Sequence, residues 1–126
     1  MPNTNITGVT ILTSLSEKDV SEVGFKFTAL ESAVGLSKVA VAAGAKAIVC
    51  SPLEIAAVRK EVGVAPIIIT PGVRPAGSSA TDDQVRTMTP KAAIEVGANL
   101  VVIGRPITNS WKQGAAAMRE RAAEIA

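Results

Sequence analysis

Four short apolar runs constrain the fold of this sequence more than any other feature. Each is rich in β-branched residues, is too short for a helix, and is continuous rather than alternating. The runs are Gly8–Leu12, Ala47–Cys50, Pro66–Thr70 and Leu100–Ile103. Runs of this kind are typical of strands that are buried on both faces, as in a parallel sheet. The sequence therefore predicts four strands of one parallel sheet.

Helical patterns separate and follow these runs. We expect helices over residues 28–43, 51–62, 89–97 and 111–126. The first pattern ends at Gly44, as at a C-cap glycine, and the second begins with Ser51-Pro-Leu-Glu54, a typical N-terminal signal. Strands that alternate with helices predict a parallel sheet with right-handed crossovers, and therefore an α/β fold.

Length and composition exclude several classes of protein. The 126 residues fit a single domain, 1–126, and a net charge of +2 from scattered residues does not suggest a nucleic-acid surface. With no histidine and one cysteine, Cys50, zinc sites and His-based triads are not expected, and Cys50 is predicted to be a buried core thiol. No apolar run approaches the roughly 18 residues of a membrane span. We expect no signal peptide and a cytoplasmic location.

Glycine and arginine follow the last two predicted strands. Thr70-Pro-Gly-Val-Arg74 comes after the third strand, and Gly104-Arg105-Pro106 comes after the fourth. A glycine lets backbone N–H groups approach an anion, and a guanidinium matches phosphate oxygens. A single pair of this kind would be read as a turn glycine beside a solvated arginine. Two arginines at the ends of adjacent strands favour a phosphate site, as in the last two loops of (β/α)8 barrels.

The segment between these two motifs is polar and long. Residues 73–86 show no apolar periodicity, are rich in Gly, Ser, Pro and Asp, and exceed the usual connection of roughly 2–6 residues. Long polar loops at the carboxyl end of a barrel strand often close over substrate. We therefore expect the loop Pro75–Asp83 to be mobile without ligand and ordered with it.

Five strings together resemble one family. They are VTILTS (Val9–Ser14), VCSPLE (Val49–Glu54), TPGVRPAG (Thr70–Gly77), DDQVRTMTP (Asp82–Pro90) and VVIGRPIT (Val101–Thr108). In this order they resemble the last four strand units, the C-terminal half, of orotidine 5′-phosphate decarboxylase. The resemblance implies half of a TIM-type (β/α)8 barrel carrying its phosphate-binding side. It also implies a lyase of pyrimidine (UMP) biosynthesis that converts orotidine 5′-phosphate to UMP and carbon dioxide without a cofactor.

The resemblance assigns substrate-binding roles to five positions. Thr13 corresponds to a residue that hydrogen-bonds the pyrimidine ring. Arg74 and Gln84 bracket the mobile loop, and Gln84 reaches from it to the phosphate and the base. Gly104 and Arg105 correspond to the main phosphate contacts. Without the resemblance, Thr13 would be read as a hydroxyl that caps a turn, and Gln84 as a solvated loop residue.

The catalytic part of the family's pattern is missing. In that family a lysine within an Asp-x-Lys-x-x-Asp array protonates C6, and nothing in this sequence fits the array. The lysines Lys18, Lys38 and Lys46 are interpreted as surface charges. We therefore expect no catalytic residue here and no activity from the isolated chain. Trp111, near the start of the last helix, is expected to be a packing anchor.

Two other functions remain open, as does the assembly. The chain could belong to a related decarboxylase or aldolase that acts on a ketose phosphate, or it could be a non-catalytic half-barrel that binds phosphates or nucleotides. Four parallel strands leave two unpaired edges, at Gly8–Leu12 and Leu100–Ile103, and exposed edges recruit partners. We therefore expect a homo-oligomer, such as a homodimer that closes an eight-stranded barrel, or a complex with a complementing N-terminal half.

Overall fold

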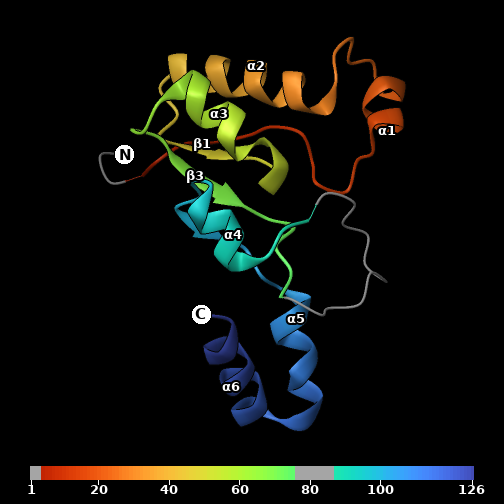
Figure 1. Ribbon diagram of the computed structural model, residues 1–126, viewed down its shortest axis with the longest axis vertical. Coiled ribbons are helices and arrows are strands. Elements are labelled where there is room, and N and C mark those ends of the chain that lie inside the picture. Colours follow the sequence, from red (N-terminus) through yellow and green to blue (C-terminus); the bar gives the residue numbers. More distant parts are fainter. Residues whose placement is uncertain (1–3, 76–86) are drawn as a thin grey trace.

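The computed structural model describes residues 4–75 and 87–126 and contains four strands with helices between them (Figure 1). The strands are β1 (Thr7–Val9), β2 (Ala47–Val49), β3 (Ile67–Thr70) and β4 (Leu100–Val101). The α-helices are α1 (Glu17–Glu22), α2 (Ala29–Ala42), α3 (Ile55–Val62), α4 (Pro90–Glu95), α5 (Arg105–Thr108) and α6 (Ala115–Ile125). Two short 3-10 helices, η1 (Pro52–Glu54) and η2 (Asn109–Gln113), precede α3 and α6.

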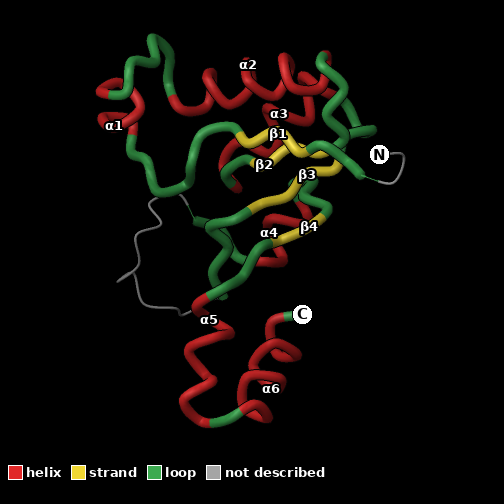
Figure 2. Tube along the Cα trace, turned by 180° about the vertical axis from the view of Figure 1, so that it is seen from behind, coloured by secondary structure: helices red, strands yellow, loops and turns green. Residues whose placement is uncertain are grey.

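The strands form one parallel sheet in the order β1-β2-β3-β4 (Figure 2). Val9 pairs with Val49, Val49 with Ile69, and Ile69 with Leu100. The predicted parallel sheet is therefore confirmed, with β1 and β4 at its edges. The strands are shorter than the apolar runs, because the paired ladder ends before the runs do.

The main core lies between the sheet and the helices. Ile48 and Ile68 project from the central strands and pack with Ile55 and Val58 of α3, and all four side chains are fully buried. At Gly8 the backbone of β1 approaches α2 so closely that an added Cβ would lie 2.7 Å from the Ala40 Cβ. The helices therefore cover one side of the sheet, and α2 and α3 pack against each other there.

A second core cluster joins α1 to the start of α2. It consists of Ile11, Val20, Ala29 and Ala33, with Leu15 and Leu36 packed against it. The apolar residues following β1 thus pack on the α1–α2 pair instead of extending the strand. Around Lys18, outside the four predicted helices, the structure shows a further short helix.

The N-terminal signal predicted at Ser51–Glu54 is confirmed. Ser51 caps η1: its backbone N–H donates to the Glu54 Oε2 at 2.9 Å, and its side chain accepts from the Leu53 N–H. Thr28 caps α2 through the same reciprocal arrangement with Glu31. The helix predicted over 51–62 therefore begins with a 3-10 turn and continues as α3.

Arg59 of α3 ties together the amino-terminal ends of β3 and β4. Its Nε and Nη2 donate to the Gly97 carbonyl at 3.1 and 3.0 Å, and its Nη1 donates to the carbonyls of Gly63 and Pro66 at 3.1 and 2.7 Å. Nη2 also donates to the Asn99 Oδ1, which accepts a further hydrogen bond from the Ile68 N–H. The Arg59 side chain thus satisfies backbone carbonyls in the two connections that precede β3 and β4.

The chain from Arg105 onward differs from the sequence-based expectation. The predicted helix over 111–126 begins only at Ala115, because Gly114 adopts a φ of +101° that ends η2. Trp111 lies in η2 and is 61% exposed, so its predicted role as a packing anchor is wrong. α6 packs mainly on α5 and η2. We call these three helices the arm, and Figures 1 and 2 show that the arm projects away from the sheet. Trp111 is exposed because the arm brings no layer over it.

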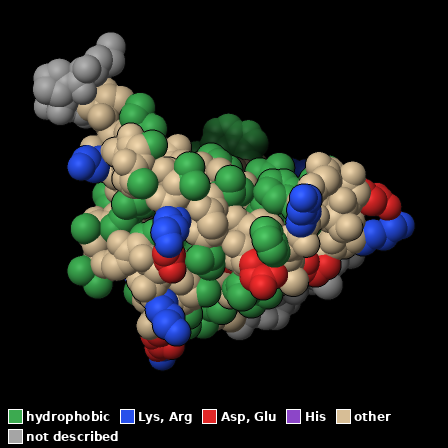
Figure 3. All heavy atoms as spheres, turned by 90° about the horizontal axis from the view of Figure 1, so that it is seen from above, with side chains coloured by type: hydrophobic (Ala, Val, Ile, Leu, Met, Phe, Trp, Pro, Cys, Tyr) green, Lys and Arg blue, Asp and Glu red, His purple; other side chains and the backbone are tan. Residues whose placement is uncertain are grey.

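The charged side chains do not form a continuous field on the face seen from above α2. Figure 3 shows lysine, arginine and acidic side chains scattered among hydrophobic ones on that face.

None of the helices in the part of the chain that the structure describes is long and apolar enough to cross a membrane.

Candidate functional site

The candidate binding residues that the structure describes all follow strands of the sheet. Thr13 follows β1, Arg74 follows β3, and Gly104 and Arg105 follow β4. Since the strands are parallel, these segments leave the sheet at the same, carboxyl edge. The Val102 N–H donates to the Thr70 carbonyl at 2.9 Å, and this hydrogen bond holds the carboxyl ends of β3 and β4 side by side. We call this edge the carboxyl rim.

Thr13 lies in the turn between β1 and α1. It is buried, at 5% exposure, and belongs to a segment where the Leu15 N–H donates to the Leu12 carbonyl at 3.1 Å. Three residues earlier, the Thr10 hydroxyl donates to the Val49 carbonyl at 2.8 Å and ties the exit of β1 to β2. Thr13 is therefore held on a fixed backbone, although β2 separates its strand from that of Arg74.

Arg74 is half-buried and its backbone is fixed. Its N–H donates to the Met88 carbonyl at 2.9 Å, and Val73 forms an isolated parallel bridge with Met88. Its guanidinium Nη1 donates to the Val73 carbonyl, also at 2.9 Å. The two ends of the long loop are therefore joined at its base, and Arg74 lies at that junction.

Gly104 and Arg105 lie where β4 leads into α5. Both residues are exposed, and the Gly104 carbonyl accepts from the N–H groups of Ile107 and Thr108 at 2.9 and 3.0 Å. An added Cβ at Gly104 would meet no atom within 4 Å. Packing within the chain therefore does not require glycine here, and the space above its backbone is open to a ligand.

Gln84 and nearly all of the predicted mobile loop, Pro75–Asp83, lie outside the described residues. The expectation that Gln84 reaches the phosphate and the base stays a prediction, as does the ordering of the loop by ligand.

Two buried polar side chains near the rim were not among the predicted binding residues. Thr70, the last residue of β3, is fully buried, and its Oγ1 has no hydrogen-bond partner within the described part of the chain. Glu54 is almost fully buried and holds the Ser51 N–H just after β2. The signal for Glu54 was its place in the capping sequence. Thr70 carried no separate signal, because it ends an otherwise apolar strand.

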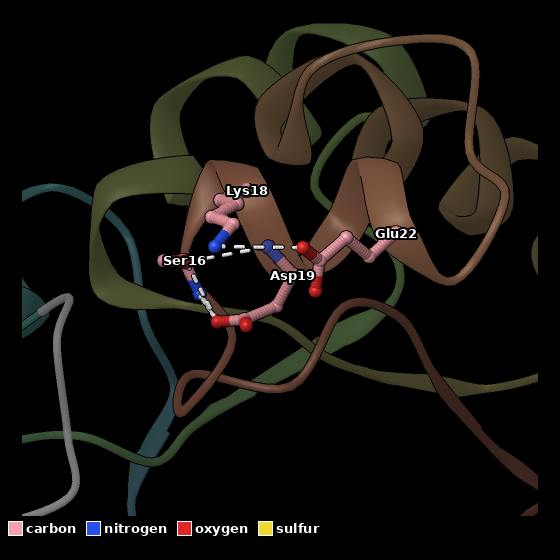
Figure 4. A network of polar contacts seen from close by, with 4 residues as sticks. All are labelled: Ser16, Lys18, Asp19 and Glu22. Atoms are coloured by element: carbon pink, nitrogen blue, oxygen red, sulfur yellow. Dashed lines mark hydrogen bonds and ion pairs between the residues drawn. The ribbon is translucent and has the colours of Figure 1, made fainter.

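The lysines noted in the sequence are surface residues, as predicted. Lys18 lies on α1 with its side chain 82% exposed, and its Nζ is 3.5 Å from the Glu22 Oε1, as Figure 4 shows beside the Ser16–Asp19 cap. Lys38 pairs with Glu61 at 2.8 Å, and this hydrogen bond and the attraction of the carboxylate raise the pKa of Lys38. Lys46 is exposed. Cys50 is buried in the main core, as expected.

The described residues contain no group of His, Cys, Asp and Glu side chains that could hold a metal ion. An apolar hollow of about 670 Å³ lies on the helix side of β4, between α4 and α6. Its lining includes Val101, Ile103 and Ile125, and it does not include the arginines of the carboxyl rim. The hollow is therefore a gap in packing near the arm, separate from the candidate binding residues.

Comparison with known families decides what kind of chain this is. The sequence model of the orotidine 5′-phosphate decarboxylase / HUMPS family matches residues 2–120. The chain belongs to this family. Its relatives include proteins named orotidine 5′-phosphate decarboxylase from Thermobifida fusca, 53% identical over 92% of this chain, and from Anaeromyxobacter sp. strain K, 45% identical over 92%.

A solved structure shows the same fold. The crystal structure of orotidine 5′-phosphate decarboxylase from Lactobacillus acidophilus superposes on 96% of this chain with a TM-score of 0.71 and 34% identity. This confirms the predicted α/β architecture, a (β/α)4 half of a TIM-type barrel. The chain spans about half the length of its relatives: 49% of the Thermobifida protein, 51% of the Anaeromyxobacter protein and 49% of the Lactobacillus chain.

Proposed function

We propose that this chain is the phosphate- and pyrimidine-binding half of an orotidine 5′-phosphate decarboxylase, and that it binds orotidine 5′-phosphate and its product UMP at the carboxyl rim. One observation carries the proposal. In a chain whose relatives bear that enzyme's name, Arg74 and the Gly104–Arg105 pair follow the adjacent strands β3 and β4. The last two loops of such barrels commonly hold a phosphate.

The chemistry of the rim suits a phosphate monoester. Arg105 is an exposed residue whose guanidinium carries a planar fork of donors, while an added Cβ at Gly104 would meet no atom within 4 Å. Arg74, on its fixed backbone, supplies a second positive charge. Thr13, at the exit of β1, is the residue we assign to the pyrimidine ring. Gln84 completes the set as a contact from the loop.

In this proposal the rim supplies binding energy at a distance from the reacting carbon. Contacts with the phosphate contribute to catalysis when they help to close the site and position the substrate. Loss of carbon dioxide from C6 also requires an acid at the ring. The described lysines that sequence analysis considered, Lys18, Lys38 and Lys46, are exposed surface residues. We therefore propose that the isolated chain binds nucleotide and does not decarboxylate it.

The proposal extends to the setting of the protein. We expect it to act in the cytoplasm in pyrimidine biosynthesis, without a cofactor, and as part of a larger assembly. The alternatives predict different ligands. A ketose-phosphate enzyme would prefer ribulose or xylulose phosphates, and a non-catalytic half-barrel would bind many simple phosphates alike.

Thermal unfolding with and without UMP tests the proposal. Ligand that binds only the native state stabilises it by RT ln(1 + [L]/Kd), about 2.7 kcal/mol at a hundredfold excess over Kd. We expect UMP to raise the Tm, and Arg105→Ala to remove the increase. Arg119→Ala, an exposed arginine of α6 away from the rim, is the matched control and should leave the increase intact. Equal protection of the Arg105→Ala variant by UMP would place the phosphate elsewhere.

Ligand choice separates the candidates. UMP and 6-azaUMP should protect the chain at concentrations where ribulose 5-phosphate and inorganic phosphate do not. Protection by ribulose 5-phosphate alone would favour the ketose-phosphate enzyme, and equal protection by all of these ligands would favour the non-catalytic half-barrel.

A further inference from the structure

Backbone hydrogen bonds join neighbouring strands where these strands reach the carboxyl rim. The Cys50 N–H donates to the Ile69 carbonyl at 3.3 Å between β2 and β3, just as the Val102 N–H donates to the Thr70 carbonyl between β3 and β4. The segments that follow β3 and β4, with their arginines, are therefore placed relative to the end of β2.

The corresponding link between β1 and β2 includes a side chain. The Val49 carbonyl accepts two hydrogen bonds from Thr10, one from its backbone N–H at 3.1 Å and one from its hydroxyl at 2.8 Å. β1 is an edge strand of three residues, and its neighbour in the sheet is β2. The Thr10 hydroxyl therefore adds a second hydrogen bond at the point where the chain leaves this short strand.

Thr10 lies three residues before Thr13, the residue that we assign to the pyrimidine ring. Thr13 belongs to the turn that Leu12 and Leu15 close with a backbone hydrogen bond, which we call the Thr13 turn. Ile11, between Thr10 and this turn, packs in the second core cluster with residues of α1 and α2. The apolar cluster thus holds the Thr13 turn against the helices, whereas the hydrogen bonds of Thr10 hold it against the sheet.

We propose that Thr10 is a positioning residue for recognition of the pyrimidine ring. Its hydroxyl fixes the Thr13 turn against β2, and β2 pairs with β3, which pairs with β4. The separation between the contact to the ring and the contacts to the phosphate is then set by hydrogen bonds across the rim, so that one nucleotide can meet both. This inference rests on the proposed function and deepens it, because it names a residue that determines how well a nucleotide is distinguished from a bare sugar phosphate.

Binding of two ligands that share a phosphate tests this role. UMP carries the pyrimidine ring and ribose 5-phosphate lacks it, and the Kd of each is measured with the full chain by calorimetric titration. Thr10→Val removes the hydroxyl at nearly constant volume. It should raise the Kd for UMP about two- to tenfold, the contribution of one neutral hydrogen bond, and leave the Kd for ribose 5-phosphate unchanged. Thr10→Ser keeps the hydroxyl and should bind UMP as the parent chain does, and so should the matched control Thr7→Val, at an exposed position of β1.

A double-mutant cycle shows whether Thr10 acts through Thr13. Once Thr13→Val has removed the contact to the ring, Thr10→Val should have no further effect on the Kd for UMP. A residue that only stabilised the fold would weaken the binding of both ligands, and its effect would add to that of Thr13→Val. Equal losses of affinity for UMP and ribose 5-phosphate, an unchanged Kd for UMP, or additive effects in the cycle would each overturn the proposal.

Amide hydrogen exchange in the free chain gives a measurement that needs no ligand. The Leu15 N–H closes the Thr13 turn, and it should exchange about two- to tenfold faster in Thr10→Val than in the parent chain or in Thr7→Val. Equal exchange in all three would show that core packing holds the turn without Thr10, and would overturn the proposal. Thr10→Ala takes the place of Thr10→Val if circular dichroism shows that the valine variant does not fold. A parent chain that bound neither ligand would contradict the proposed function, and the exchange rate of Leu15 would still decide whether Thr10 holds the turn.

Discussion

The helices α3 and α6 follow two strands of the same sheet, β2 and β4, and yet they pack very differently. α3 buries Ile55 and Val58 completely, and its Arg59 satisfies three backbone carbonyls. α6 is longer, contains Met118 and Ile125, and buries no residue. The difference lies in what surrounds them, because α3 lies over two strands of this chain whereas α6 has only β4 and a hollow beside it. Helix packing here is set by the strands available and not by the apolar content of the helix.

The largest expected effect comes from truncating the core under α3. Ile68→Ala should lower the free energy of unfolding by about 2–5 kcal/mol, because it removes a fully buried side chain and leaves a cavity. Ile125→Ala in α6 should cost less than about 1 kcal/mol in the isolated chain. Urea unfolding followed by circular dichroism measures both values. Similar costs at the two positions would mean that α3 and α6 are packed equally well. A cost at Ile125 that rises once a complementing N-terminal half is bound would show that α6 packs fully only when further strands lie beneath it.

Removing the Arg59 side chain should give the next largest effect. Arg59→Ala should destabilise the chain by about 2 kcal/mol, since the carbonyls of Gly97, Gly63 and Pro66 lose a charged donor. Arg59→Lys should recover only part of this, because an ammonium cannot reproduce the planar fork. The exposed neighbour Lys60→Ala is the control. A full recovery by lysine would mean that charge, and not geometry, joins β3 to β4.

The helix caps provide a smaller test of the same comparison. Thr28 caps α2 through its side chain, whereas Gly114 precedes α6 without a side-chain cap. Thr28→Ser should be nearly neutral, and Thr28→Ala should cost about 1 kcal/mol of stability. If Thr28→Ala leaves the urea midpoint unchanged, the start of α2 is held by tertiary packing alone.

The smallest expected effect is a dependence of stability on pH at the same cap. Hydrogen bonds from the Thr28 backbone and side chain lower the pKa of the Glu31 carboxyl below its usual value. A depressed pKa in the folded state stabilises the chain above the unfolded-state pKa, and this contribution is lost as pH falls through the folded pKa. Glu31→Gln should therefore be less stable than the parent chain at neutral pH, and the difference should vanish in acid. A difference that stays constant from neutral pH into acid would assign it to something other than this titration.

Much of the fold could be predicted because its signals are local. Strands buried between helices and a barrel interior appear as continuous apolar runs, and the runs around Ile48 and Ile68 identified β2 and β3. The cap at Ser51 is likewise a short-range pattern. The arm was predicted poorly, because a helical pattern from Trp111 onward does not reveal that Gly114 breaks it or that no layer covers it.

For the candidate site, local motifs pointed to some residues and not to others. Motifs indicated Arg74, Gly104 and Arg105, and the parallel order of the strands brings them to one rim. At the opposite, amino-terminal ends of β3 and β4, the hydrogen bonds of Arg59 could not be predicted from local motifs either, because Gly97 lies 38 residues further along the chain. Nor did any local pattern mark Thr70, whose burial depends on its place at the end of a central strand.

Turnover of orotidine 5′-phosphate tests most directly the proposal that this chain contains the substrate-binding residues of the carboxyl rim but lacks the acid that protonates C6. The assay follows the loss of substrate absorbance with the purified chain, alone and together with the unmatched half of the Thermobifida protein. We expect no turnover above the uncatalysed rate from the chain alone, and turnover once the second half is bound. Decarboxylation by the chain alone would contradict the account, and Lys18, just beyond β1, would then be the first lysine to replace.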